Sequence, residues 1–159
     1  MPISKKPDPD YRFRHGDHNL KVAESLLTNK SISAHDPWDW IVTTSFYAAV
    51  HFVEAVIESG KPPLKYYREP VKIRSSTELK GEIINGQVNH SEHTIRLQLM
   101  NENFHEVSTG FTDLFQASCT ARYTDYKAYD HALAEQFHDI ATTEIRVWAK
   151  NILWPSSKV

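Results

Sequence analysis

Histidine, arginine and glutamate side chains recur in the middle of the chain at spacings that would place them on one surface. His93 and Arg96 lie one helical turn apart, and so do His51 and Glu54 in an earlier segment. Histidine and arginine side chains that share one surface can bind a phosphate or a base. These four residues are therefore the candidates for a catalytic or anion-binding cleft.

The same positions also permit a structural interpretation. Charged groups on inward helix faces are costly to bury unless they pair with one another. Pairing of Glu54 with Arg96 or Arg122 would hold three helices in register. The members of this predicted polar network are Tyr47, His51, Glu54, Arg96, Ser118 and Arg122. The structural network and the ligand-binding cleft stand as alternatives.

A second candidate is the proline-rich segment between Lys61 and Lys80, which carries six basic residues against Glu69 and Glu78. Lysines and arginines would hold phosphates, while two adjacent tyrosines stack on bases. The predicted RNA- or anion-binding residues are Lys61, Lys65, Tyr66, Tyr67, Arg68, Lys72 and Arg74. The alternative is an ordinary loop whose tyrosines pack against the rest of the protein.

Other chemistry finds little support in the sequence. There is no phosphate-binding loop, no dinucleotide-binding glycine motif, no hydrolase elbow and no HExxH pair, so no cofactor and no metal site are predicted. A net charge of −2 does not by itself favour nucleic acid. A single cysteine, Cys119, is typical of a reducing compartment. With no signal peptide or membrane span expected, we predict a cytoplasmic protein.

The elements that must position these residues are predicted to form an all-α domain, an antiparallel bundle of about five helices. The strongest prediction is a central helix over Trp38–Ser59, which is apolar around most of its circumference and is followed by Gly60 as a C-terminal cap. The other predicted helices cover Asp17–Asn29, Ser91–Val107, Thr109–Tyr123 and Tyr126–Leu153.

The connection from Gly60 to Asn89 is predicted to be irregular, with a short helix over Ser76–Ile84 as an option and no strand. The domain is expected to span residues 11–155, between disordered ends at residues 1–10 and 156–159. The third and fourth predicted helices carry more apolar residues than one buried stripe needs, which favours a homodimer. These residues are Leu97, Leu99, Met100, Phe104, Phe111, Leu114, Phe115 and Ala121.

Three runs of sequence resemble the HEPN superfamily of small bacterial proteins. They are SFYAAVHFVEAVI (Ser45–Ile57), HSEHTIR (His90–Arg96) and FTDLFQASCTARYTDY (Phe111–Tyr126). The resemblance implies an antiparallel helical bundle, dimerisation, and association with RNA or nucleotide in a prokaryotic toxin or defence setting. Many HEPN proteins are metal-independent ribonucleases that use an Arg-x4-6-His motif.

The predicted helical core lacks that motif and instead has the reverse order, His93 before Arg96. Only Arg12 and His18 show the required spacing, before or within the first helix. The sequence therefore predicts a HEPN-like protein that associates with RNA or nucleotide without strong ribonuclease activity. One alternative is a dimerising protein–protein interaction module. The other is a metal-independent ribonuclease with an atypical site at His93, Arg96 and His51.

Overall fold

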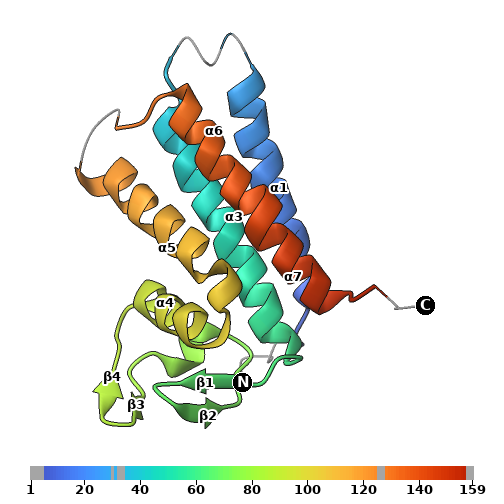
Figure 1. Ribbon diagram of the computed structural model, residues 1–159, viewed down its shortest axis with the longest axis vertical. Coiled ribbons are helices and arrows are strands. Elements are labelled where there is room, and N and C mark those ends of the chain that lie inside the picture. The colour runs from blue at the N-terminus through green and yellow to red at the C-terminus, as the bar shows by residue number, and fades with distance from the viewer. Residues whose placement is uncertain (1–5, 30, 32–34, 125–127, 157–159) are drawn as a thin grey trace.

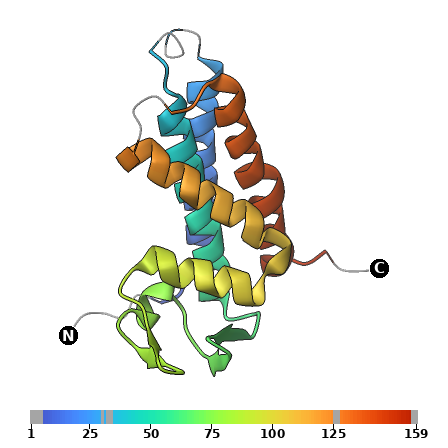
Figure 2. The same ribbon diagram turned by 60° about the vertical axis from the view of Figure 1, so that its left-hand side comes forward.

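A computed structural model describes residues 6–29, 31, 35–124 and 128–156 of the 159-residue chain. Helix makes up 71% of the structure. The long helices α1 (Pro9–Thr28), α3 (Trp38–Ser59) and α5 (His105–Cys119) lie together with α6 (His131–Asp139), while α4 (Glu92–Asn103) crosses one end of the bundle (Figures 1 and 2). The predicted helical bundle is thus confirmed, although the fold is not purely α-helical.

Two small antiparallel hairpins follow α3 and lie beside α4 at the same end of the molecule (Figure 1). The first pairs β1 (Leu64–Tyr66) with β2 (Glu69–Val71), and the second pairs β3 (Ile83–Ile84) with β4 (Gln87–Val88). The prediction that the segment contains no strand is therefore wrong. Strands of two or three residues are too short for alternation of apolar and polar residues to reveal them.

Between the hairpins lies a 3-10 turn, η1, at Ser76–Leu79. It occupies the first part of the short helix considered over Ser76–Ile84; a turn follows it, and the last two residues of that range, Ile83 and Ile84, form strand β3. Ser75 caps η1 by accepting a hydrogen bond from the Thr77 amide. We call the whole region from Gly60 to Asn89 the hairpin segment.

The central helix α3 has the predicted bounds, and it ends at Gly60, whose φ of 64° is left-handed. Its inward residues, among them Phe46, Phe52 and Ile57, are fully buried. Within the described part of the chain, α3 alone is long and apolar enough to cross a membrane by length and composition. However, 78% of its apolar window is covered by the rest of the protein, as expected for a core helix.

Helix α1 begins at Pro9, well before the predicted start at Asp17, so the prediction of disorder is wrong for the last residues of the 1–10 stretch. Asp8 caps the helix by accepting from the Tyr11 amide at 2.9 Å, and Pro9 occupies the first turn, where no amide is needed. Further along, Gly16 lies against the ring of Phe52, so closely that a Cβ atom at Gly16 would stand 2.5 Å from it. This contact joins α1 to α3. Residues 1–5 lie outside the described part of the chain.

The sequence predicted that the third helix ends at Val107. In the structure the boundary between α4 and α5 lies earlier, at Phe104. The Asn103 side chain donates to the carbonyls of Lys65 and Leu99 and accepts from the Lys65 amide, which ties the end of α4 to β1. Ser91 caps the start of α4, as predicted.

The last helix is continuous from His131 to Leu153, because α6 passes through a π-helical stretch at Ile140–Ile145 into α7 (Arg146–Leu153). Its start is capped by Asp130, later than the predicted Tyr126, which lies outside the described residues together with Asp125, Lys127 and the tail at residues 157–159. The π-helical stretch packs against α5 at Gly110, where a Cβ atom would stand 2.7 Å from the Glu144 carboxylate and 3.0 Å from Ile140. A sequence pattern based on a constant 3.6-residue period does not reveal such a stretch.

The apolar residues that favoured a homodimer are used within the chain itself. Leu99, Met100, Phe104, Phe111 and Leu114 are buried in the main core, and the other three are partly buried. The apolar surplus inferred from the sequence is therefore accounted for by one protomer. Dimerisation stays a prediction that rests on the HEPN resemblance.

Candidate functional site

The polar stripe on α3 contains a buried ion pair at its centre. The Glu54 side chain is 3% exposed, and its Oε1 lies 2.7 Å from Nε of Arg96, whose side chain is 8% exposed. Glu54 also accepts hydrogen bonds from the hydroxyl and the backbone amide of Ser76. One carboxylate thus joins α3, α4 and η1.

Arg96 makes two further contacts within α4. Its Nη2 lies 3.2 Å from Oε2 of Glu92, and its Nη1 lies 3.3 Å from Nδ1 of His93. Because two carboxylates neutralise this guanidinium, little of its charge remains for a ligand. The structure therefore places Glu54 and Arg96 in the predicted structural network rather than at an open anion site.

His51 lies half-buried on the same stripe, one turn before Glu54, and stacks on a histidine of α1. The ring centroids of His51 and His15 are 4.2 Å apart at an interplanar angle of 30°. Burial, aided by the charges of His15, Arg12 and Arg96, lowers the pKa of His51 to about 4. His51 is consequently neutral near pH 7. His15 was not among the predicted site residues, because no local pattern links it to a residue 36 positions away.

His93 is half-buried between two phenylalanine rings, with centroid distances of 5.4 Å to Phe46 and 5.6 Å to Phe115. Burial is the main cause that lowers its pKa, and the nearby charges of Arg96 and Arg122 add to it. A neutral imidazole at this position can accept a proton. The two histidines thus meet one requirement of a general base, but the adjacent Arg96 is already paired.

Arg122 does not join the Glu54 pair, so the predicted six-residue network divides into two parts. Its Nη1 donates to the Tyr47 hydroxyl at 2.7 Å, and its Nε donates to the Ser118 carbonyl at 3.2 Å. The guanidinium also lies over the rings of Tyr47 and Tyr123. The buried Ser118 hydroxyl has no hydrogen-bond partner within the described part of the structure. Tyr47 and Arg122 therefore form a second polar cluster, which shares no hydrogen bond with the Glu54–Arg96 pair among the residues that the structure describes.

The basic segment divides in a way that the sequence did not indicate, because two of its cations cap helices. Arg74 Nη1 donates to the Glu58 carbonyl at the end of α3 at 2.8 Å. Lys61 donates its ammonium proton to the Leu153 carbonyl at the end of α7. Cations suit these positions, since the C-terminal carbonyls of a helix carry partial negative charge. Lys61 and Arg74 thus have a structural role.

The two tyrosines of the basic segment face inward to different degrees. Tyr66 is fully buried, and this burial raises the pKa of its phenol. Tyr67 is half-buried, and the Asn89 amide donates to both phenol oxygens. Tyr66 therefore has no ring face for a base, as the alternative of an ordinary packed loop anticipated.

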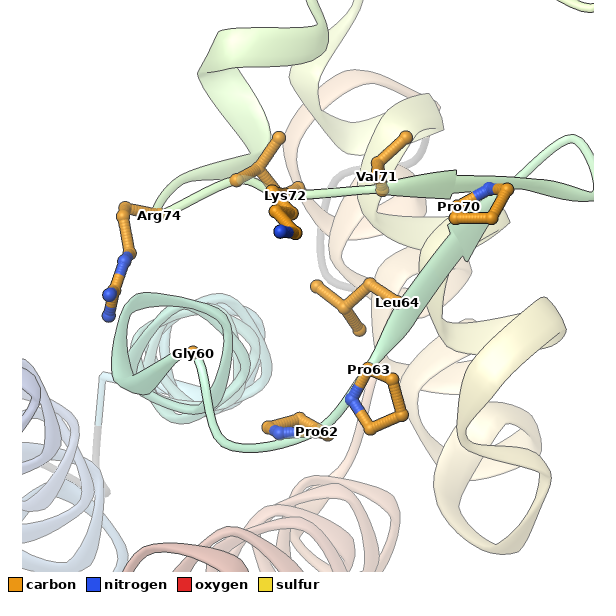
Figure 3. Close-up of a pocket in the computed structure, with 9 residues that line it drawn as sticks. Gly60, Pro62, Pro63, Leu64, Pro70, Val71, Lys72 and Arg74 are labelled. Atoms are coloured by element: carbon orange, nitrogen blue, oxygen red, sulfur yellow. The ribbon is translucent and has the colours of Figure 1, made fainter.

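The remaining cations are exposed. The structure records no side-chain partner for Lys65, Arg68 or Lys72 among the residues it describes. Lys72 lines a pocket of about 380 Å³ between the end of α3 and the first hairpin. Figure 3 shows the side chains of Lys72 and Leu64 directed toward the middle of this hollow, with Arg74 beside the helix end.

The wall of this pocket is otherwise apolar. Its remaining lining residues, which carry no charge, are Gly60, Pro62, Pro63, Pro70, Val71 and Ile73. The prolines fix the backbone angle φ on both sides, so the pocket is largely preformed. We call it the basic pocket, since Lys72 and Arg74 are its only charged residues.

No group of three or more histidine, cysteine, aspartate or glutamate side chains that could hold a metal ion occurs among the described residues. No family model matches the chain, and no curated protein and no solved structure matches it either. The class that the fold and the candidate site define is therefore a helical bundle with an inserted pair of hairpins and a basic pocket.

Proposed function

We propose that this protein binds a nucleotide or RNA phosphate in the basic pocket and has no strong ribonuclease activity. The observation that carries the proposal is the charge of the pocket: the exposed ammonium of Lys72 beside the helix-capping guanidinium of Arg74, with no carboxylate among the lining residues. The Lys72 ammonium would hold the phosphate, while the apolar wall covers the sugar or the base. The HEPN resemblance supports this ligand class, and a toxin or defence setting rests on that resemblance alone.

The state of the arginines supports the expectation of weak catalysis. Arg96 is paired with Glu54 and Glu92, and Arg12 lies 2.7 Å from Glu58. Arg12 is also the arginine that has the family-like spacing to His18. A guanidinium already neutralised by a carboxylate is poorly placed to stabilise the charge that develops on a phosphate during cleavage.

Isothermal titration calorimetry with adenosine and uridine monophosphate tests the binding. Lys72→Glu should weaken binding roughly tenfold or more, since one charge-assisted hydrogen bond contributes about 1.5–3 kcal/mol. Lys80→Glu is the matched control, because Lys80 is an exposed lysine of the same segment outside the pocket. Binding that is unchanged in Lys72→Glu, or absent from the intact protein, would contradict the proposal.

Incubation with RNA in EDTA separates binding from the ribonuclease alternative. We expect no robust cleavage. Robust cleavage that His93→Ala abolishes would replace the proposal with an atypical site at His93, Arg96 and His51.

A protein–protein interaction module is the second candidate, and one observation favours it. Ile83 and Val88 are cross-strand partners in the second hairpin, and they are 76% and 43% exposed. An exposed apolar pair on a hairpin can form a contact with a partner protein or a second copy of the chain. Light scattering that gives twice the 18.3 kDa chain mass, and the chain mass for Ile83→Asp, would support it.

A further inference from the structure

The turn of the first hairpin adopts a backbone conformation that its residues disfavour. Tyr67 and Arg68 join β1 to β2 and have φ values of 47° and 70°. Positive φ at two successive central residues is the pattern of a type I′ turn, which normally requires Asn and Gly. A bulky residue with positive φ is uncommon, and such strain is retained where the surroundings impose it.

Three neighbouring side chains hold this turn in place. The Asn85 amide donates to the Tyr67 carbonyl at 3.0 Å, and the Arg68 amide donates to Glu102 at 2.6 Å. The Asn89 amide donates to the Tyr67 hydroxyl at 2.9 Å. These contacts come from the second hairpin, from α4 and from the connection between them. These hydrogen bonds therefore hold the strained turn against α4 and the second hairpin.

The turn borders an open hollow of about 660 Å³ that is lined mostly by amides. Five of its lining residues carry uncharged hydrogen-bonding side chains, one is a cation and one is an anion. They are Tyr67, Asn85, Gln87, Gln98 and Asn101, with Arg68 and Glu102. Both oxygens of the anion, Glu102, already accept hydrogen bonds, from the Arg68 amide and the Gln98 side chain. The guanidinium of Arg68 has no recorded partner in the described part of the structure.

We propose that this amide hollow reads the base edges of single-stranded RNA, with Arg68 holding an adjacent phosphate or base. The inference rests on the proposed function and extends it from a phosphate site to a base-recognition site. Asn and Gln amides donate and accept at once, as the edges of unpaired bases require, and Arg binds both phosphate and base acceptors. Lys72, at the other end of the first hairpin, would hold a second phosphate.

The test measures fluorescence anisotropy of labelled homopolymers of A, C and U, with polyphosphate as a probe of charge alone. The intact protein should prefer one homopolymer by roughly 5- to 100-fold. Arg68→Gly should weaken RNA binding about tenfold, and the double variant Gln87→Ala/Asn101→Ala should abolish the base preference while polyphosphate binding is retained. Lys80→Ala controls for the loss of one exposed cation.

Each other outcome is decisive. RNA and polyphosphate binding that weaken equally in the double variant, or a wild-type protein without base preference, would overturn the inference. Mononucleotide binding that depends on Lys72 without any RNA binding would overturn it and leave the proposed function intact. RNA binding that depends on Arg68 but not on Lys72 would support RNA recognition at the amide hollow and contradict phosphate binding in the basic pocket. Thermal unfolding of each variant verifies that it is folded.

Discussion

The helical bundle and the hairpin segment differ in where their charged side chains lie and in whether those side chains are paired. In the bundle, Glu54 and Arg96 are more than nine-tenths buried; Glu54 accepts hydrogen bonds from Arg96 and Ser76, and Arg96 donates to Glu54 and Glu92. In the hairpin segment, Arg68 and Lys72 are exposed, and no carboxylate pairs with either side chain among the described residues. Charges paired inside a protein specify its structure, whereas unpaired cations at the edge of a hollow remain available to a ligand.

The backbone shows the same contrast. Of the four non-glycine residues with positive φ in the described structure, three lie in the hairpin segment and none lies within a helix. Local strain of this kind persists at binding sites, because function rather than stability favours the residue. The two regions therefore predict different responses to mutation: loss of stability in the bundle, and loss of binding in the hairpin segment.

The largest effect is expected from Glu54→Ala, which tests the bundle side of the comparison. Removing the carboxylate leaves the Arg96 charge buried beside only one remaining acid, Glu92, and should lower the free energy of unfolding by about 3–5 kcal/mol. Urea denaturation measures the change. The control is Asp10→Ala, which removes an exposed ion pair: Asp10 is 60% exposed and its partner Arg14 is 67% exposed, so its loss should cost about 1 kcal/mol or less.

A change below about 0.5 kcal/mol for Glu54→Ala would show that the pair does not stabilise the bundle. Glu54→Gln keeps the shape and some of the hydrogen bonds. If this variant is folded, its affinity for nucleotides should equal that of the wild type, since Glu54 does not line the basic pocket.

The bundle could be predicted from the sequence because its signals are local and periodic. The length of α3, its cap at Gly60 and the cap at Ser91 all follow from patterns a few residues wide. The Glu54–Arg96 pair was predicted as one of two options, because a buried carboxylate needs a cation and few are available. The early start of α1 was also signalled, by Asp8 and Pro9, but the neighbouring prolines concealed it.

The hairpin segment could not be predicted to the same extent. Asn85-Gly86 is a dipeptide typical of a two-residue hairpin turn, and it marks the second hairpin. By contrast, nothing in the local sequence marks Tyr67-Arg68 as a turn, because contacts from Asn85 and Glu102 impose it. The capping roles of Lys61 and Arg74 likewise depend on helix ends that only the fold brings near.

The next prediction concerns pH and the histidines of the bundle. The pKa of His51 is about 4 in the folded protein and about 6.5 when unfolded. As the pH falls, the unfolded state takes up the proton first, so stability is complete above about pH 6.5 and is lost toward pH 4. Because His51 is only half-buried, solvent screening reduces the expected loss to about 1–2 kcal/mol.

The groups that face His51 are His15 and Arg12 on α1, Glu54 on α3 and Arg96 on α4. His51→Phe keeps an aromatic ring against His15 but cannot titrate, so its stability should fall less between pH 7 and pH 4.5. His18→Gln, at an exposed position of α1, should behave like the wild type. An unchanged slope in His51→Phe would assign the pH dependence to other groups, with His93 first among them.

The smallest expected change in stability comes from the two hairpin turns, whose central residues have nearly the same φ values. Tyr67 and Arg68 have φ values of 47° and 70°, while Asn85 and Gly86 have 49° and 73°. Arg68→Gly should relieve strain and raise the free energy of unfolding by about 0.5–1 kcal/mol. Gly86→Ala should lower it by a similar amount through the backbone alone, since a Cβ atom at Gly86 would meet nothing within 4 Å.

These two substitutions should have opposite effects on stability, and only the first should affect RNA binding. Arg68→Gly is expected to make the protein more stable and a weaker RNA binder, which is the result expected if the strain is retained for function. Thermal unfolding and anisotropy on the same samples measure both quantities. If Arg68→Gly lowers stability, the arginine side chain stabilises the hairpin and the strain argument fails. If it raises stability without weakening RNA binding, the turn is merely tolerated, and the contrast between the two regions would then rest on Lys72 alone.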